Sequence, residues 1–164
     1  NTQNQGIEKQ LEINTRNQEA PNFGLNNARN RMSEVAKAVQ GLLSTIDTSE
    51  GIGREISVIA RQQQDEQAEI AQLLDTIESR KGFLRQFLGP DYAALKEMER
   101  IMYKNQNRIQ QLQMLQNNLQ NQALENNLQQ AIQKMIEQNE ALEEQVQFER
   151  DKPGMFGWLI RIFN

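Results

Sequence analysis

The side chains best suited to acid–base chemistry in this chain are its carboxylates, because it contains no His and no Cys. His is the commonest general base and metal ligand, and Cys supplies thiolate nucleophiles and ligands. Glu97, Glu99, Glu143 and Glu144 are scattered along polar segments, as solvated charges are. No Gly-rich phosphate loop is present, and a Glu-x-x-His motif is impossible without His. We therefore expect no catalytic residue, no metal ligand, no cofactor and no enzymatic activity.

The second group of candidate residues consists of apolar side chains suited to binding. They are concentrated in residues 153–164, which include the only Trp. If this segment is helical, Gly154, Gly157, Arg161 and Asn164 form a narrow stripe and every other position is apolar. Such a face suits a hydrophobic groove on a partner or a membrane interface. The predicted contact residues of this amphipathic anchor are Met155, Phe156, Trp158, Leu159, Ile160, Ile162 and Phe163.

Two other interpretations of the anchor stay open. It folds back and caps the end of its own helical bundle, or it begins a membrane span that continues beyond residue 164. No segment of the sequence reaches the ~20 apolar residues that span a bilayer.

A second apolar cluster surrounds Gly89-Pro90, where Phe83, Phe87 and Tyr92 lie beside Leu84 and Leu88. Aromatic side chains bury large areas, so one interpretation is a plug at the end of a bundle. The cluster has more apolar groups than one short turn can cover, so the alternative is an exposed tip. Phe83, Phe87 and Tyr92 are the candidate tip contacts.

The elements that position these clusters are helices. Apolar residues spaced alternately three and four apart predict a helix over 22–47, after a flexible polar arm over 1–21. The same spacing predicts a second helix over 53–88. Within it, the polar stretch 62–67 is expected to stay helical but to bury little.

A third helix is predicted over 91–152, because no Gly or Pro interrupts this stretch. Asp91 is its expected N-cap, and its length would be on the order of 90 Å. Its apolar positions follow two frames whose phase slips within 120–127, so the packing partner should change there. Asn105 and Asn139 fall on the apolar seam, where a buried Asn fixes the register of helix packing.

The predicted fold is all-α. It is an elongated antiparallel helical hairpin or three-helix coiled-coil-like bundle over 22–152, with one very long C-terminal helix and a short hydrophobic tail. The turn at Gly89-Pro90 makes the second and third helices antiparallel. The first helix either lies collinear with the second and covers the distal half of the third, or folds back and leaves that half to another chain.

The composition restricts the classes of function that the chain can have. The chain carries 18 Lys and Arg against 22 Asp and Glu, so it has no basic surface for nucleic acid. With 37% hydrophobic and 5% aromatic residues, it supports narrow seams between helices better than a thick core. Asn and Gln make up roughly a quarter of the residues, in keeping with solvated helix faces. The alternative is that these amides line contacts between identical or similar rods.

We therefore predict a non-enzymatic structural or scaffolding component of a larger assembly, with a rigid helical spacer and a hydrophobic docking segment. Its partners would be other protein subunits, including copies of itself, and the tail offers a membrane interface. Neither nucleic acid nor a small-molecule substrate is expected. The alternative is a membrane-acting tether, or a delivered effector associated with secretion or a virion. The absence of Met at position 1 and of Cys is compatible with a processed envelope, secreted or virion protein, and leaves the compartment open.

Overall fold

The described residues of the chain, in a computed structural model, are 2–47, 51–80 and 88–150; for 2–23 only the backbone is described. They form four long α-helices, which are α1 (Thr2–Thr45), α2 (Gly51–Ser79), α4 (Tyr92–Gln116) and α5 (Gln122–Arg150). No strand occurs among the described residues. The predicted all-α class is confirmed.

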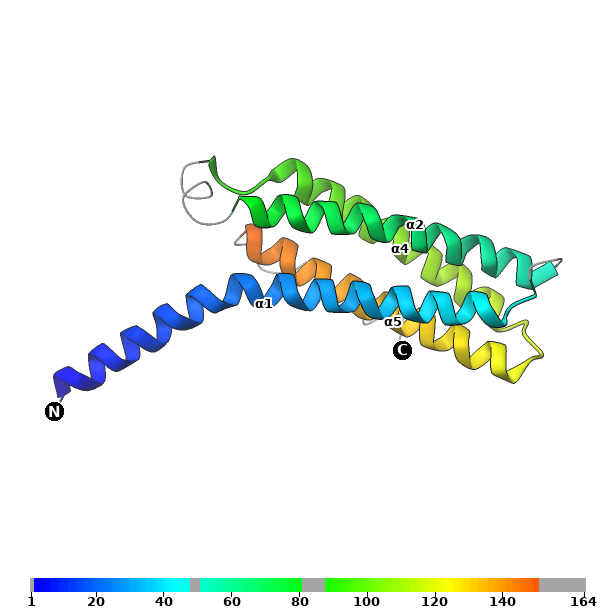
Figure 1. The fold of residues 1–164 in the computed structure, drawn as a ribbon, viewed down its shortest axis with the longest axis horizontal. Coiled ribbons are helices and arrows are strands. Elements are labelled where there is room, and N and C mark those ends of the chain that lie inside the picture. Colours follow the sequence, from blue (N-terminus) through cyan, green and yellow to red (C-terminus); the bar gives the residue numbers. More distant parts are fainter. Residues whose placement is uncertain (1, 48–50, 81–87, 151–164) are drawn as a thin grey trace.

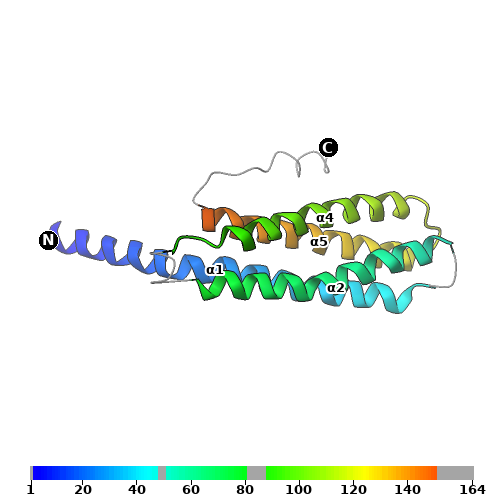
Figure 2. The ribbon, with the colours of Figure 1, turned by 90° about the horizontal axis from the view of Figure 1, so that it is seen from above.

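The four helices pack as an antiparallel bundle (Figure 1). Each helix contacts the next one along the chain, and α5 closes the ring by packing on α1. Figure 2 shows α1 and α2 in one layer and α4 and α5 in the other. Helices α2 and α5 are therefore diagonal to each other, as are α1 and α4.

The predicted continuous helix over 91–152 is wrong, because α4 ends at Gln116 and α5 begins at Gln122. The chain reverses in 117–121, next to the predicted phase slip, and α5 returns antiparallel to α4. The apolar seam of α5 is consequently buried within the same chain. The first helix combines parts of the two expected places. It folds back on α2, as one alternative predicted, and it also covers α5, the distal half of the predicted third helix, as the other predicted.

Asn side chains make this reversal without Gly or Pro. Asn121 Oδ1 accepts hydrogen bonds from the backbone N–H groups of Ala123 at 3.0 Å and Leu124 at 3.1 Å. Asn118 Nδ2 donates to the carbonyl oxygen of Met114 at 3.2 Å. Asn competes with the helical backbone for hydrogen bonds and so favours helix ends over helix interiors.

The first residues of α1 also differ from expectation. The sequence predicts a flexible arm over 1–21, whereas the backbone of α1 is helical from Thr2 through Pro21. The φ angle of Pro is compatible with a helix, although Pro removes one backbone hydrogen bond and strains the preceding turn. Figure 1 shows this part of α1 projecting beyond the other helices, at an angle to the rest of α1.

The connection from α2 to α4 is longer than predicted. Helix α2 ends at Ser79, short of the predicted end at residue 88, and residues 81–87 lie outside the described part of the chain. The predicted N-cap is confirmed, since Asp91 Oδ1 accepts from the backbone N–H of Ala94 at 3.1 Å. Gly89 has a φ of 71°, a conformation that other residues rarely adopt.

The core consists of two apolar clusters. One lies at the turn end of the bundle, where α1 joins α2 and α4 joins α5; its members include Val35, Val39, Leu42, Ile56, Ile109, Leu112, Leu128, Ile132 and Met135. The other lies at the terminal end, where α1 enters the bundle and α5 ends; its members include Leu25, Ile70, Leu74, Ile77, Leu95, Met98, Ile101, Leu142 and Val146. A layer of buried polar side chains separates the two clusters.

Candidate functional site

Most of the site residues predicted from the sequence lie outside the described part of the chain. This applies to the whole anchor, which comprises Met155, Phe156, Trp158, Leu159, Ile160, Ile162 and Phe163, and to Phe83 and Phe87 of the tip. Tyr92 is described, as the first residue of α4, and 63% of its surface is exposed. Tyr92 therefore does not plug the bundle, and its exposed neighbour Leu88 does not either.

The segments singled out by the sequence nevertheless attach to one end of the bundle. Gly24 of α1 touches α5, because a Cβ on Gly24 would lie 2.5 Å from Gln145 Oε1. One buried cluster contains Leu25, Ile77, Leu95 and Val146, from all four helices. The ends of α2 and α5, the start of α4 and residue 24 of α1 thus lie together at the terminal end of the bundle (Figure 1).

Ion pairs tie the helix ends together there. Arg80 Nε lies 3.1 Å from Asp91 Oδ2 and joins the end of α2 to the start of α4. Arg150, the last residue of α5, pairs with Glu99 of α4. These side chains are partly exposed, so each pair contributes only about 0–1 kcal/mol. These ion pairs therefore contribute little to the stability of the bundle. Their main effect is to hold the helix ends from which the flanking segments begin.

Two buried polar residues lie beneath this end. Gln145 Nε2 donates to Glu149 Oε1 at 2.9 Å, and both residues are buried. Gln145 Oε1 is buried and finds no hydrogen-bond donor among the described residues. Since an unmet buried acceptor costs about 1–3 kcal/mol, the amide of Gln145 lowers stability at the junction of α1 and α5.

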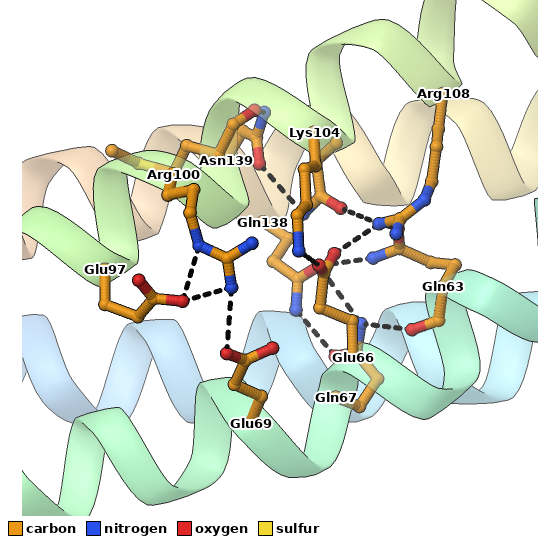
Figure 3. Close-up of polar contacts among 12 residues, drawn as sticks. Gln63, Glu66, Gln67, Glu69, Glu97, Arg100, Lys104, Arg108, Gln138 and Asn139 are labelled. Carbon is orange, nitrogen blue, oxygen red and sulfur yellow. Dashed lines mark hydrogen bonds and ion pairs between the residues drawn. The ribbon is translucent and has the colours of Figure 1, made fainter.

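The polar layer in the middle of the bundle is built around Gln138 of α5 (Figure 3). Gln138 Nε2 donates to Gln67 Oε1 at 2.7 Å. Gln138 Oε1 accepts from Gln63 Nε2 at 3.3 Å and from Gln67 Nε2 at 3.4 Å. Gln63 and Gln67 belong to α2, so these bonds cross the diagonal of the bundle. They align two helices that are not packing neighbours.

A second pair of amides links α4 to α5 in the same layer. Asn105 Nδ2 donates to Asn139 Oδ1 at 3.1 Å, and Asn139 Nδ2 donates to the carbonyl oxygen of Met102 at 3.1 Å. Both Asn residues are buried, as their positions on the apolar seam predicted.

A charged group borders the layer between α2 and α4. Glu66 is buried and pairs with Lys104 Nζ at 3.3 Å and with the guanidinium of Arg108. Arg108 Nη1 also donates to Gln63 Oε1 at 3.2 Å and to Asn105 Oδ1 at 3.0 Å. The charge of Glu66 is thereby compensated, as a buried carboxylate requires.

Sequence reasoning missed the α2 half of this layer. The stretch 62–67 was expected to bury little, yet Gln63, Glu66 and Gln67 are buried. The signal was present in the spacing, because Gln63 and Gln67 continue the helical stripe that runs from Ile59 to Ile70. Treating Gln as a surface residue concealed that stripe.

Neighbouring charges shift several carboxyl pKa values. Hydrogen bonds from Arg31 and Arg100 lower the pKa of Glu34 and Glu97, respectively. Burial raises the pKa of Glu140. The lowered values come from ion pairs on the bundle surface, and these groups are spread over separate faces.

Within the described ranges, no group of three or more His, Cys, Asp or Glu residues could hold a metal ion. None of the helices in the described part is long and apolar enough to cross a membrane. Comparison with family models, curated proteins and solved structures finds no match. The function must therefore be inferred from the residues themselves.

Proposed function

We propose that this chain is a non-enzymatic structural component of a larger assembly, which uses its helical bundle as a rigid spacer and docks through its terminal end. The observation that carries this proposal is the attachment of three segments at that end: residues 1–23, 80–91 and 151–164. Two of them hold the most apolar stretches of the sequence outside the helical seams.

The apolar side chains of residues 155–163 are the reason to expect that this segment docks to another surface. Each large apolar side chain of 155–163 contributes roughly 1.5–3 kcal/mol if it becomes fully buried. The end of a four-helix bundle is narrow, so it offers too little surface to cover all of them. An external apolar surface, such as a groove on a partner subunit, is the proposed destination.

The spacer role is supported by the polar layer. Bonds from Gln138 to Gln63 and Gln67, and from Asn105 to Asn139, are satisfied in one alignment of the helices. Polar groups buried in a helical interface disfavour other registers. A bundle with a fixed register holds its two ends at a constant separation, which is what a spacer requires.

The sequence of the anchor supports a second candidate, a membrane-acting tether or effector. Trp158, Phe156 and Phe163 together with Arg161 match the side chains that favour a bilayer interface. In this case the terminal end would dock to lipid instead of protein.

The two candidates are distinguished by comparing the full chain with a chain that ends at Lys152. Sedimentation measures the mass of the native particle, and flotation with anionic vesicles measures lipid binding. The proposal predicts that the full chain associates into larger particles but floats weakly, and that truncation abolishes the association while circular dichroism shows unchanged helicity. Flotation that depends on the anchor, without particle growth, would instead support the tether.

A matched pair of aromatic variants sharpens the test. Trp158→Ala should weaken association strongly, because large aromatics dominate such contacts. Tyr103→Ala is the control, since Tyr103 is 66% exposed on α4, away from the terminal end. If truncation removes cooperative thermal unfolding while particle mass is unchanged, the segment is a cap of the bundle and the docking proposal is wrong.

A further inference from the structure

We infer that the α4–α5 connection is a hinge through which two copies of this chain exchange α5 and form a domain-swapped dimer. In the open form, α4 and α5 would join into one helix, and α5 would fill the groove between α1, α2 and α4 of the second copy. This partner is independent of what binds the terminal end.

The first residues of the connection keep helical geometry. Asn117 has φ −62° and ψ −16°, within the right-handed helical region. The N–H of Asn118 bonds to Leu115 O, and that of Leu119 to Gln116 O, each at 3.1 Å, so a tight helical turn continues past the end of α4. Gly and Pro are absent from 117–121, so none of these residues prevents a continuous helix.

The closed form is held at the hinge by side chains. Asn121 caps α5 through Ala123 and Leu124, and Asn118 caps the end of α4 through Met114. In the open helix, backbone hydrogen bonds replace these caps. Because every contact between α5 and the other helices is re-formed with the second copy, the two forms differ chiefly at the hinge.

The course of a continuous helix explains why the open form requires a second copy. Leu112 of α4 and Leu128 of α5 are both buried. In one continuous helix with 3.6 residues per turn, positions 112 and 128 point about 160° apart. The continuous helix would also carry α5 past the turn end of the bundle, out of reach of the chain's own α1 and α2, so only another molecule could cover its buried face.

The polar layer identifies that molecule as a second copy. Helix α5 carries Gln138 and Asn139, which are fully buried and need amide partners. The groove of an identical chain presents Gln63, Gln67 and Asn105 at the required positions. An unrelated apolar groove would leave these amides unsatisfied, at a cost that opposes binding.

The exchange is detectable with engineered cysteines, because the natural chain has none. Asn127 Nδ2 lies 3.1 Å from Thr45 Oγ1, across the α1–α5 interface. The variant T45C/N127C should form a disulfide within a closed monomer, but between chains in a swapped dimer. We would unfold this variant in guanidinium at high protein concentration, refold it, and separate monomer from dimer by gel filtration. Each fraction would then be oxidised and run on a non-reducing denaturing gel. A covalently linked dimer is expected from the dimer fraction.

Substitutions at the hinge, made in the T45C/N127C background, test whether opening of the hinge causes the dimerisation. Removing the caps with N118A/N121A should raise the dimerisation constant by roughly tenfold, since two capped hinges open per dimer. Q120P should lower it at least as much, because Pro interrupts a continuous helix. N107A/N126A makes the same chemical change at two exposed helical positions outside the hinge and should leave the dimer fraction unchanged.

Either of two results would overturn the inference. One is a refolded dimer that dissociates to monomer on the denaturing gel, which indicates ordinary surface association, including association through the anchor. The other is a dimer fraction that is negligible throughout or unaffected by N118A/N121A and Q120P. Circular dichroism of each variant confirms that the helices are formed.

Discussion

At the scale of single residues, Glu66 is a buried carboxylate held by two cations. It is buried between Lys104 and Arg108, and Arg108 is itself mostly covered. Removing charges from water is costly, so such a group is tolerated only with good partners. Breaking the pair leaves the guanidinium of Arg108 without its carboxylate inside the bundle.

Glu66→Gln should therefore lower the free energy of unfolding by about 3 kcal/mol, as expected when one partner of a buried ion pair is removed. Glu69→Gln is the matched control on the same helix, because its pair with Arg100 is exposed on both sides and worth less than about 1 kcal/mol. Urea denaturation measures the free energy of unfolding of both variants. Equal effects of the two substitutions would show that the charge of Glu66 is not buried as described.

The Asn105–Asn139 pair gives a second prediction at this scale. Asn139→Ala should cost about 1–3 kcal/mol, because Asn105 Nδ2 and the carbonyl of Met102 both lose their partner. Replacing both Asn residues by Leu should recover much of that stability but weaken register specificity. Thermal unfolding tests the first statement, and sedimentation of the double variant, which should show mixed oligomers, tests the second.

At the scale of elements, helix ends are set by side chains that satisfy backbone groups. Asp91 starts α4 and Asn121 starts α5 by accepting backbone N–H bonds. Asp91 also pairs with Arg80 at the end of α2, so one carboxylate serves as both cap and ion-pair partner. The two roles are separable, because Asn caps a helix about as well as Asp does but carries no charge.

Asp91→Ala should lower stability by about 1 kcal/mol through loss of the cap. Asp91→Asn should cost much less, since only the partly exposed pair with Arg80 is lost. Guanidinium unfolding of both variants gives the comparison. If Asp91→Asn were as destabilising as Asp91→Ala, the ion pair and not the cap would define the start of α4.

At the scale of the whole molecule, ion pairs join α1 to α5 on the outside of the bundle. Arg31 Nη1 lies 2.7 Å from Glu137 Oε2, and Lys134 Nζ lies 3.2 Å from Glu34 Oε2. Hydrogen bonds from Lys134 lower the pKa of Glu137, while those from Arg31 and Lys134 lower that of Glu34. The bundle therefore binds protons at these carboxylates less readily than the unfolded chain does.

The sign of the resulting pH dependence follows from these shifts. Glu34, Glu97 and Glu137 have folded pKa values below the ordinary value of 4.5, so their contribution to stability is complete above that value and is lost as the pH falls through the folded values. The melting temperature should fall on acidification from about pH 6 to pH 3. A melting temperature that rises over this range would contradict the prediction.

Glu140 has the opposite effect on the pH dependence of stability, so a substitution at Glu140 provides the control. Partial desolvation raises the pKa of Glu140, with further increases from Glu137 and Glu144, so its ionised form opposes folding above that pKa. Glu140→Gln should consequently raise the melting temperature at pH 7 and leave it nearly unchanged at pH 3, where Glu140 is protonated. The acid-induced loss of stability should be steeper in this variant than in the natural chain.

The features that the sequence determined by itself are local. Apolar spacing specified the helices, Asp91 marked the start of α4, and the seam positions of Asn105 and Asn139 predicted their burial. These features were predictable because each depends on hydrogen bonds or periodicity within a few turns of one helix.

The tertiary structure alone decided the break at 117–121, the burial of Gln63 and Gln67, and the meeting of the ends of α2 and α5 with the start of α4 at one end of the bundle. Each Asn in 117–121 disfavours a continuous helix by no more than about 0.7 kcal/mol of helix propensity, so local energies separate a continuous helix from a reversed one only weakly. Burying the seam of α5 against α1 is worth far more than that difference. The reversal also places Gln138 opposite α2, and it brings the end of α5 to the end where α1 enters the bundle.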